Sequence, residues 1–180
     1  MKIEDLKKPL SIFDIEFRVQ NINKGGYCTI LAYKDARVDM NRLDDVCTPL
    51  NWKREHLNNN ANCIVSIWDE SKKQWISKED TGTESFTEKA KGLASDSFKR
   101  ACFNWGIGRE LYDYPVISVK LKADEFEVKD GRAKATWNLK LKEWIWFSQF
   151  TENTLSYLAC KDQDGKKRFS FGKYIEPIKK

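Results

Sequence analysis

One stretch of the sequence constrains the fold most, because residues 86–105 predict a long amphipathic helix with defined ends. Ser85 followed by Glu88 fits a capping box, and Gly106 stands where a left-handed residue commonly ends a helix. Apolar residues recur inside the helix at intervals of three and four and form one stripe, namely Ala90, Leu93, Ala94, Phe98, Ala101, Cys102 and Trp105. Because this stripe must pack on another element, the helix predicts a layered fold.

The same helix carries positive charges away from the apolar stripe. Lys89 and Arg100 are eleven residues apart and therefore nearly in line, and Lys91 and Lys99 flank them. Such a strip suits phosphate groups. However, Asp96 precedes Lys99 and Arg100 by three and four residues, which is the spacing of ordinary ion pairs on a helix surface. The pattern alone leaves both a phosphate-binding strip and a solvated face open.

Upstream of this helix, the sequence predicts a hairpin followed by another helix. Residues 15–19 and 27–33 are rich in β-branched and aromatic residues around a Lys-Gly-Gly turn, which predicts a hairpin with Arg18 on its first strand. Residues 34–47 have apolar positions at helical spacing, and Pro49 then ends the pattern. The second helix is therefore expected to follow the hairpin directly.

Three more strands are predicted between the two helices. Trp52 opens the first, residues 62–69 form the second, and residues 74–80 form the third. A polar turn around Glu70 to Lys73 joins the last two. The resulting core has the order β-β-α-β-β-β-α, which predicts an α+β fold with an antiparallel sheet packed against helices.

Beyond Pro115 the sequence predicts mainly strands. Asp-Gly pairs at residues 130–131 and 164–165 mark two further hairpins. Residues 132–142 alternate between apolar and mostly basic residues, which predicts a strand with a basic row on one face. We therefore expect a core in residues 1–115 and a β-rich C-terminal extension in residues 116–180 that packs on the core or continues its sheet.

Charge is distributed unevenly along the chain. Residues 1–119 hold 18 Lys and Arg against 18 Asp and Glu, whereas residues 120–180 hold 14 against 9. Any anion site in the core must therefore come from local clustering and not from bulk charge. The five cysteines are widely spaced and include no Cys-x-x-Cys pair, which favours reduced thiols over a zinc site. We expect a cytoplasmic protein that neither spans a membrane nor carries a secretion signal.

Three stretches together resemble a known family: YKDARVDMNRLDDVCTPLNWKREH, EDTGTES and DSFKRACFNWGIG. They are similar to the single-strand annealing proteins typified by the eukaryotic radiation-sensitivity double-strand-break repair mediator, and most similar to its phage recombinases of the Sak type. The resemblance spans roughly residues 15–112. It implies a non-enzymatic protein, without cofactor or metal, that binds single-stranded DNA in the groove of a homo-oligomeric ring or filament and anneals complementary strands.

The resemblance also implies which residues bind DNA. Lys99 and Arg100 match cations on the groove floor, Arg18 a groove arginine, Tyr33 a tyrosine near the bound backbone, and Lys91 a lysine of the same helix. Lys72 and Lys73 fall where the family places an outer DNA site, although a hairpin tip is commonly just solvated. We add Lys89 from the cationic strip, Arg37, which Asp35 could equally hold, and Arg109, which could equally serve the helix end.

Other functions were weighed against the same residues. A metal-dependent nuclease would draw on the pairs Glu70 with Lys72 and Glu127 with Lys129, and on Asp44 or Asp45. A single-strand protector that coats DNA without annealing it stays open as well. No phosphate loop of the type GxxxxGK[ST] is present, and the single histidine cannot form a multi-histidine metal site. Expected partners are single-stranded DNA, further copies of the chain, and a single-strand-binding protein or exonuclease of phage recombination.

Overall fold

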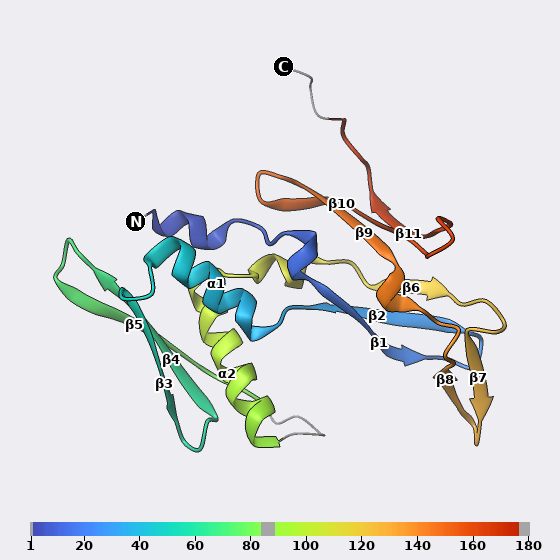
Figure 1. Cartoon of the computed structure of the whole chain (residues 1–180), viewed down its shortest axis with the longest axis horizontal. Helices are drawn as coiled ribbons and strands as arrows, with labels where there is room; N and C mark the ends of the chain where they lie inside the picture. Colours follow the sequence, from blue (N-terminus) through green and yellow to red (C-terminus); the bar gives the residue numbers. More distant parts are fainter. Residues whose placement is uncertain (1, 84–88, 177–180) are drawn as a thin grey trace. The chain divides into compact units, whose positions relative to one another are not determined.

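A computed structural model gives the fold of the chain, and it describes residues 2–83 and 89–176. In the second helix, side chains are described from residue 92 onward. The capping box predicted at Ser85 and Glu88 lies outside the described residues. The described part forms two α-helices and several antiparallel sheets, which confirms the predicted α+β class (Figure 1).

The chain divides into two compact units, each made from two separate stretches of sequence. The first unit contains Met1–Leu10 and Lys34–Arg109. The second unit contains Ser11–Tyr33 and Glu110–Lys180. The polypeptide therefore passes between the units three times, and each unit combines two stretches that are separated in the sequence.

The first unit contains one three-stranded sheet and both α-helices. The sheet is antiparallel, with the strand order β3 (Trp52–Leu57), β4 (Asn62–Asp69) and β5 (Gln74–Thr81). The helices are α1 (Ala36–Cys47) and α2 (Lys89–Trp105), and a 3-10 turn covers Ile3–Lys7. Helix α2 packs against β4 and β5, and α1 packs against α2 and the 3-10 turn.

The core of the first unit confirms the C-terminal half of the predicted apolar stripe, whereas Leu93 and Ala94 are half-buried. Phe98, Ala101 and Cys102 on α2 have no exposed surface, and Val65 on β4 is equally buried. The indole N–H of Trp105 donates a hydrogen bond to the carbonyl oxygen of Val65 at 3.0 Å, and it does so in a buried position. This contact joins the last turn of α2 to the central strand of the sheet.

The second unit is built from strands. One antiparallel sheet has the order β1 (Glu16–Ile22), β2 (Tyr27–Tyr33) and β6 (Ile117–Lys120). Another has the order β11 (Lys167–Gly172), β10 (Thr154–Lys161) and β9 (Ile145–Thr151). A hairpin of β7 (Phe126–Lys129) and β8 (Arg132–Ala135) and 3-10 turns at Ile12–Asp14, Arg109–Asp113 and Leu141–Glu143 complete the described elements. Residues from both sheets, including Cys28, Ile117 and Leu158, share one buried cluster.

Most predicted elements are confirmed. The chain from β1 to α2 has the predicted order β-β-α-β-β-β-α. Both Asp-Gly pairs connect adjacent antiparallel strands, β7 with β8 and β10 with β11. The domain division at residue 115 stays a prediction. The strand pairing adds that β6 joins β2, so the extension continues the sheet of the N-terminal hairpin.

Two local predictions are wrong. The long strand over residues 132–142 is not formed, because β8 ends at Ala135 and the Thr136 backbone N–H then donates to the Glu125 carbonyl at 3.0 Å. The basic residues of that segment therefore do not share one sheet face. The helix predicted from residue 34 also starts later than expected: Tyr33 is the last residue of β2, and α1 begins only after Asp35, whose side chain caps it.

Candidate nucleic-acid interface

The two central cations of α2 have different surroundings. Arg100 forms an ion pair with Asp80 of β5, with Nε at 3.3 Å from Oδ1, and its side chain is 41% exposed. Lys99, in contrast, has no hydrogen bond or ion pair with any residue in the ranges that the structure describes. Arg100 thus partly serves to hold α2 on the sheet, whereas Lys99 is half-buried and its side chain does not join α2 to any described residue.

Arg37 and Lys99 act on the same carboxylate although they belong to different helices. The Asp35 side chain accepts hydrogen bonds from the backbone N–H and the Nε of Arg37, both at 2.8 Å. These bonds, and in smaller measure the positive charge of Lys99, lower the pKa of Asp35. Two cations therefore act on one acid at the start of α1, and the charge of Lys99 acts in the same way on the neighbouring Asp39.

Beneath this point lies a buried ion pair between Lys34 and Asp39. Both side chains are almost completely inaccessible, and the Lys34 ammonium lies 4.6 Å from the centroid of the Phe103 ring. Burial raises the pKa of Asp39 to about 6, against the opposing charge and hydrogen bond of Lys34. Lys34 is therefore a structural cation of the first unit and not part of the exposed site.

Three other predicted cations have partners in the fold. Arg109 donates through Nε and Nη2 to the carbonyl oxygen of Phe103, at 3.1 and 2.6 Å, and so closes the C-terminal end of α2. Lys72 and Lys73 form ion pairs within the β4–β5 turn, Lys72 with Asp69 at 3.6 Å and Lys73 with Glu70. The predicted residues Lys89 and Lys91 begin α2, and their side chains lie outside the described part of the molecule.

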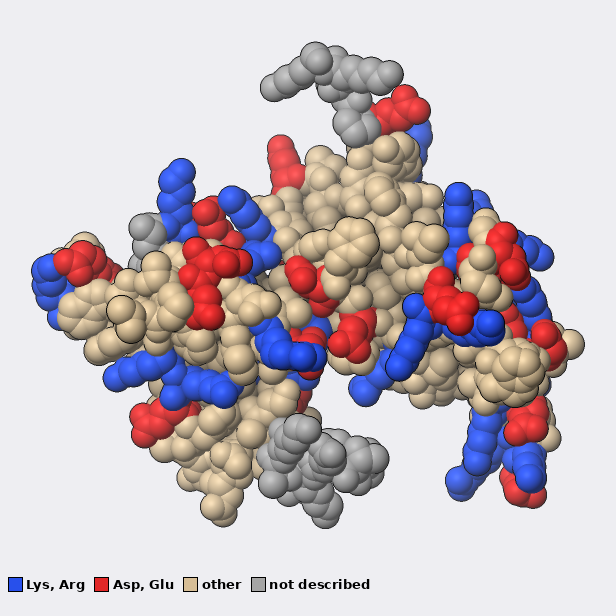
Figure 2. Space-filling model, in the orientation of Figure 1, with Lys and Arg blue, Asp and Glu red and all other residues tan. Residues whose placement is uncertain are grey.

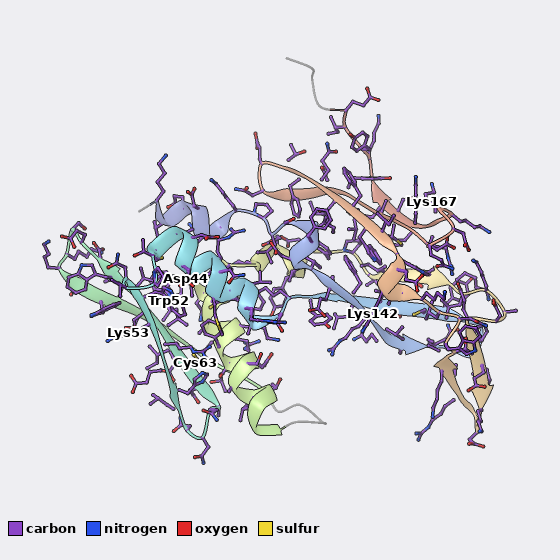
Figure 3. The ribbon with its side chains drawn as sticks, viewed as in Figure 1. Asp44, Trp52, Lys53, Cys63, Lys142 and Lys167 are labelled. Atoms are coloured by element: carbon purple, nitrogen blue, oxygen red, sulfur yellow. The ribbon has the colours of Figure 1, made fainter. Side chains whose placement is uncertain are left out.

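The predicted residues Arg18 and Tyr33 come together in the second unit. The Arg18 guanidinium carbon lies 5.0 Å from the centroid of the Tyr33 ring. Both residues line a groove of about 590 Å³, together with Phe13, which is 94% exposed, and Lys142. Lys142 is labelled in Figure 3, and no ion pair joins it to the described residues. The groove thus combines two cations with accessible rings, which are the groups that contact phosphates and bases of single strands.

One wall of this groove is made of stacked rings. Phe17 and Trp146, both lining residues, lie with their ring centroids 3.6 Å apart and their planes within 3° of parallel. Trp144 also lines the groove and is almost fully buried. These rings pack on one another and so hold the wall in place. A ligand would therefore contact the more exposed lining residues, such as Phe13 and Lys142.

Sequence reasoning missed three exposed cations. Lys142 joins the groove only because residues 141–143 form a turn and not a strand. Arg54 lies over the Phe98 ring at 4.8 Å, and Lys53 lies over the Trp75 ring at 4.7 Å. Figure 2 shows basic side chains over β3, where Figure 3 labels Lys53. The Trp-Lys-Arg run at the start of β3 is the sequence signal for Lys53 and Arg54. Whether these cations lie over aromatic rings depends on residues distant in sequence, Trp75 and Phe98.

Two of the acids considered for a metal site, Asp44 and Glu70, have other partners in the fold. Asp44 accepts a hydrogen bond at 2.6 Å from the indole N–H of Trp52, and Figure 3 shows the two side by side. Glu70 accepts from Lys73 and from the indole N–H of Trp68. Within the described ranges, no three His, Cys, Asp or Glu side chains are placed to hold a metal ion, and all five cysteines are free and buried. None of the helices described there is long and apolar enough to span a membrane.

Comparison with known proteins found two similar curated sequences. The chain is 30% identical over 122 residues to the single-stranded DNA-binding protein DdrA of Deinococcus radiodurans. The matched segment covers 64% of this chain and 58% of the relative. It is 32% identical over 122 residues to DdrA of Deinococcus deserti, covering 64% of this chain and 60% of that relative. No family model and no solved structure matches. The chain thus spans about three fifths of the length of these relatives, and over that part it is similar to single-stranded DNA-binding proteins.

Proposed function

We propose that this protein binds single-stranded DNA in DNA repair and recombination, mainly through the phosphate backbone and without nucleotide hydrolysis. The observation that carries the proposal is the convergence of Arg37 and Lys99 on Asp35, with Lys99 unpaired within the described residues. Similarity to two proteins named as single-stranded DNA-binding supports it. Backbone contacts give an affinity that does not depend on sequence, which a general repair protein needs.

Phosphate binding at this point follows from the local charge. Arg37 is 80% exposed, so its guanidinium can reach a ligand while its Nε stays bonded to Asp35. Arg100 stands one residue beyond Lys99 and keeps 41% of its side chain exposed despite its ion pair with Asp80. A phosphate that binds Lys99 displaces no described protein partner, and the counterions that the DNA releases on binding add a favourable term.

The groove of the second unit adds a second kind of contact. Arg18 and Lys142 supply positive charge, and Phe13 and Tyr33 supply aromatic faces. Rings of this kind stack on bases whatever their identity, at about 1–3 kcal/mol for each base. Because the two sites lie in different compact units, we treat each as a separate contact with the strand, and each can be tested by itself.

Strand annealing is the more specific part of the proposal. It rests on the family resemblance, as do a ring or filament of copies and a phage recombination setting. An annealing protein accelerates the pairing of complementary oligonucleotides in the absence of ATP, whereas a protector slows it. The protector is the second candidate, since the relatives carry the name of single-stranded DNA-binding proteins and nothing more. Electron microscopy with and without DNA distinguishes rings or filaments from single copies.

Replacing Lys99 by Gln tests the phosphate site most directly, because it removes a charge that no described residue pairs with. We expect weaker binding of oligothymidylate and a smaller dependence of log K on log salt, by about 0.7 for each lost phosphate contact. The double variant Lys99→Ala with Arg100→Ala should lower affinity further. Unchanged affinity and salt dependence in the folded Lys99→Gln protein would refute the site.

A matched control is available in the same unit. Lys7 and Lys8 are adjacent exposed lysines that pair with Glu4 and Asp5 on the N-terminal 3-10 turn. The double variant Lys7→Ala with Lys8→Ala removes the same net charge as the α2 double variant. If both double variants weaken binding equally, the effect comes from overall charge and not from the site at Lys99.

A further inference from the structure

The sheet of β9, β10 and β11 presents one face away from the buried cluster of the second unit. Leu158 and Cys160 point into that cluster, so Tyr157, Ala159 and Lys161, which alternate with them along β10, share the opposite face. Residues paired across an antiparallel sheet stand on the same side of it. The register of β9 and β11 therefore identifies which of their residues belong to this face.

Three cross-strand rows define the chemistry of the face. In one, Phe147 and Ser170 flank Ala159, and in the neighbouring row Ile145 and Lys167 flank Lys161. A third row places Gln149 and Gly172 on either side of Tyr157. The middle row thus holds one aromatic ring beside two small residues, with Tyr157 in the row at one end and the lysines in the row at the other. Among the described residues that the register assigns to this face, none is acidic.

Three aromatic rings form a cluster on this face. The centroids of Phe147, Tyr157 and Tyr174 lie 5.7 to 6.0 Å from one another, with interplanar angles between 57° and 66°. Phe147 and Tyr174 keep 46% and 44% of their surface exposed. Edge-to-face contacts of this kind hold each ring in a defined orientation while leaving part of its surface accessible.

The chain itself fixes Tyr174 on the sheet. The side-chain amide of Gln149 donates to the carbonyl oxygen of Ile175 at 2.6 Å and accepts from the backbone N–H of Ile175 at 2.9 Å. Because Gln149 stands on β9 within the same face, this two-way hydrogen bond holds the segment around Tyr174 against the sheet. The aromatic cluster is therefore organised before any ligand arrives, which reduces the entropy lost on binding.

The lysines at the other end are exposed. Lys161 and Lys167 stand opposite each other on β10 and β11, and no ion pair joins either to the residues that the structure describes. Figure 2 shows basic side chains gathered at this end of the sheet, where Figure 3 labels Lys167. Two like charges side by side repel each other, and an anion placed between them removes that repulsion.

We infer that this face is a second contact surface for single-stranded DNA, on which bases stack against Phe147 and Tyr174 while phosphates meet Lys161 and Lys167. The inference rests on the proposed function and extends it to a surface that neither the α2 cations nor the Arg18 groove includes. An extended aromatic and cationic sheet face suits a flexible strand, because bases have sequence-independent π faces and the backbone carries the negative charge. A purely apolar partner would leave both lysines unpaired.

The test combines affinity with crosslinking, using the 180-residue chain and oligothymidylate. Phe147→Thr removes a ring but keeps strand propensity, and Lys161→Gln removes a charge. Since stacking of one base on an aromatic ring is lost, we expect Phe147→Thr to lower affinity by about tenfold. Trp137→Thr is the matched control, because Trp137 is 84% exposed in the same unit and is not on this face. Irradiation of oligothymidylate containing 5-bromodeoxyuridine should crosslink peptides that contain Phe147 or Tyr174.

The outcomes separate this inference from the proposed function. If the unaltered protein binds no single-stranded DNA, the proposed function itself fails. If it binds, but Phe147→Thr and Lys161→Gln retain full affinity and crosslinks form only at other peptides, the second surface is refuted and the function stands. If Phe147→Thr changes the mass of the assembly in light scattering while DNA affinity stays unaltered, the face joins copies of the chain and the inference is equally overturned.

Discussion

The Arg18 guanidinium lies over the Tyr33 ring, 5.0 Å from its centroid, because the register of β1 and β2 makes them diagonal neighbours. Glu16 pairs directly with Tyr33, and Arg18 stands two residues further along the same face. The Tyr33 hydroxyl donates to the Glu16 carboxylate, so both ends of the ring side chain are held. Tyr33 thereby orients Arg18 at the groove.

This relationship predicts graded effects at Arg18. Arg18→Gln should weaken binding of oligothymidylate and reduce the slope of log K against log salt by about 0.7. Arg18→Lys should retain the salt dependence but lose affinity, since an ammonium lacks the planar stacking of guanidinium on a ring. The control is Lys24→Gln in the exposed β1–β2 turn. Equal behaviour of Arg18→Gln and this control would exclude Arg18 from the DNA contact.

Asp35→Asn is predicted to strengthen DNA binding. Asp35 is the carboxylate on which Arg37 and Lys99 converge, and it also caps α1 through the Arg37 backbone N–H. Asn caps helices about as well as Asp, so the fold should be retained while one negative charge disappears. Unit charges ~4 Å apart in water interact by about 1 kcal/mol, so we expect affinity to rise about fivefold at low salt. Fluorescence anisotropy measures the change, and a loss of affinity would show that the carboxylate positions the cations instead of opposing them.

The fold was largely predictable because its signals are local. The apolar stripe through Phe98 and Trp105, the run of β4 and the two Asp-Gly turns each depend on residues close in sequence, and the structure confirms them. The strand expected over residues 132–142 failed for a non-local reason. Its alternation continues past Ala135, but hydrogen bonds from Thr136 to Asp124 and Glu125 turn the chain there.

The candidate site was predictable only in its residue types. The pattern identified Lys99, Arg100 and Arg37 as cations, but it could not tell that Arg100 pairs with Asp80 while Lys99 has no described partner. Such pairing depends on which strand lies beneath α2. Likewise, the alternating pattern of residues 132–142 predicts Lys142 only as part of a basic row on a strand. The 3-10 turn at Leu141–Glu143 instead places Lys142 on the same groove as Arg18.

Gly82→Ala is predicted to destabilise the first unit. A Cβ at this position would lie 2.5 Å from the backbone nitrogen of Ser97 and 2.9 Å from the carbonyl oxygen of Leu93, both on α2. Because these are backbone atoms of a packed helix, α2 must shift away from the end of β5, at a cost of about 1–3 kcal/mol. Chemical denaturation measures this loss, with Gly25→Ala as control, since a Cβ there first meets a side-chain oxygen at 3.3 Å. Equal stability of the two variants would contradict the close approach.

A buried ion network makes the second unit sensitive to one arginine. Arg168 donates to both oxygens of Glu125, at 2.8 and 2.7 Å, and to Asp162 at 3.2 Å. All three side chains are at most 5% exposed. Arg168→Met leaves the buried Glu125 carboxylate without its cation and Asp162 with Lys122 alone, and breaking a buried pair in this way costs about 3–5 kcal/mol. Lys166→Met, in the exposed turn beside it, should cost almost nothing.

The same network predicts how this cost depends on pH. Burial raises the pKa of Glu125 and of Asp162, but hydrogen bonds outweigh it and hold both pKa values below their ordinary range. For Glu125 they come from Arg168 and the backbone N–H of Lys122, and for Asp162 from the backbone N–H of Lys166, from Lys122 and from Arg168. Carboxyls with a lowered folded-state pKa stabilise the fold fully above their unfolded pKa, near 4, and lose that contribution as the pH falls through the folded value. The stability difference between the unaltered protein and Arg168→Met should therefore be largest near neutral pH and narrow below about pH 4. Urea denaturation of both proteins across this range measures it, and a difference that does not change with pH would mean that the carboxylates are not ionised partners of Arg168.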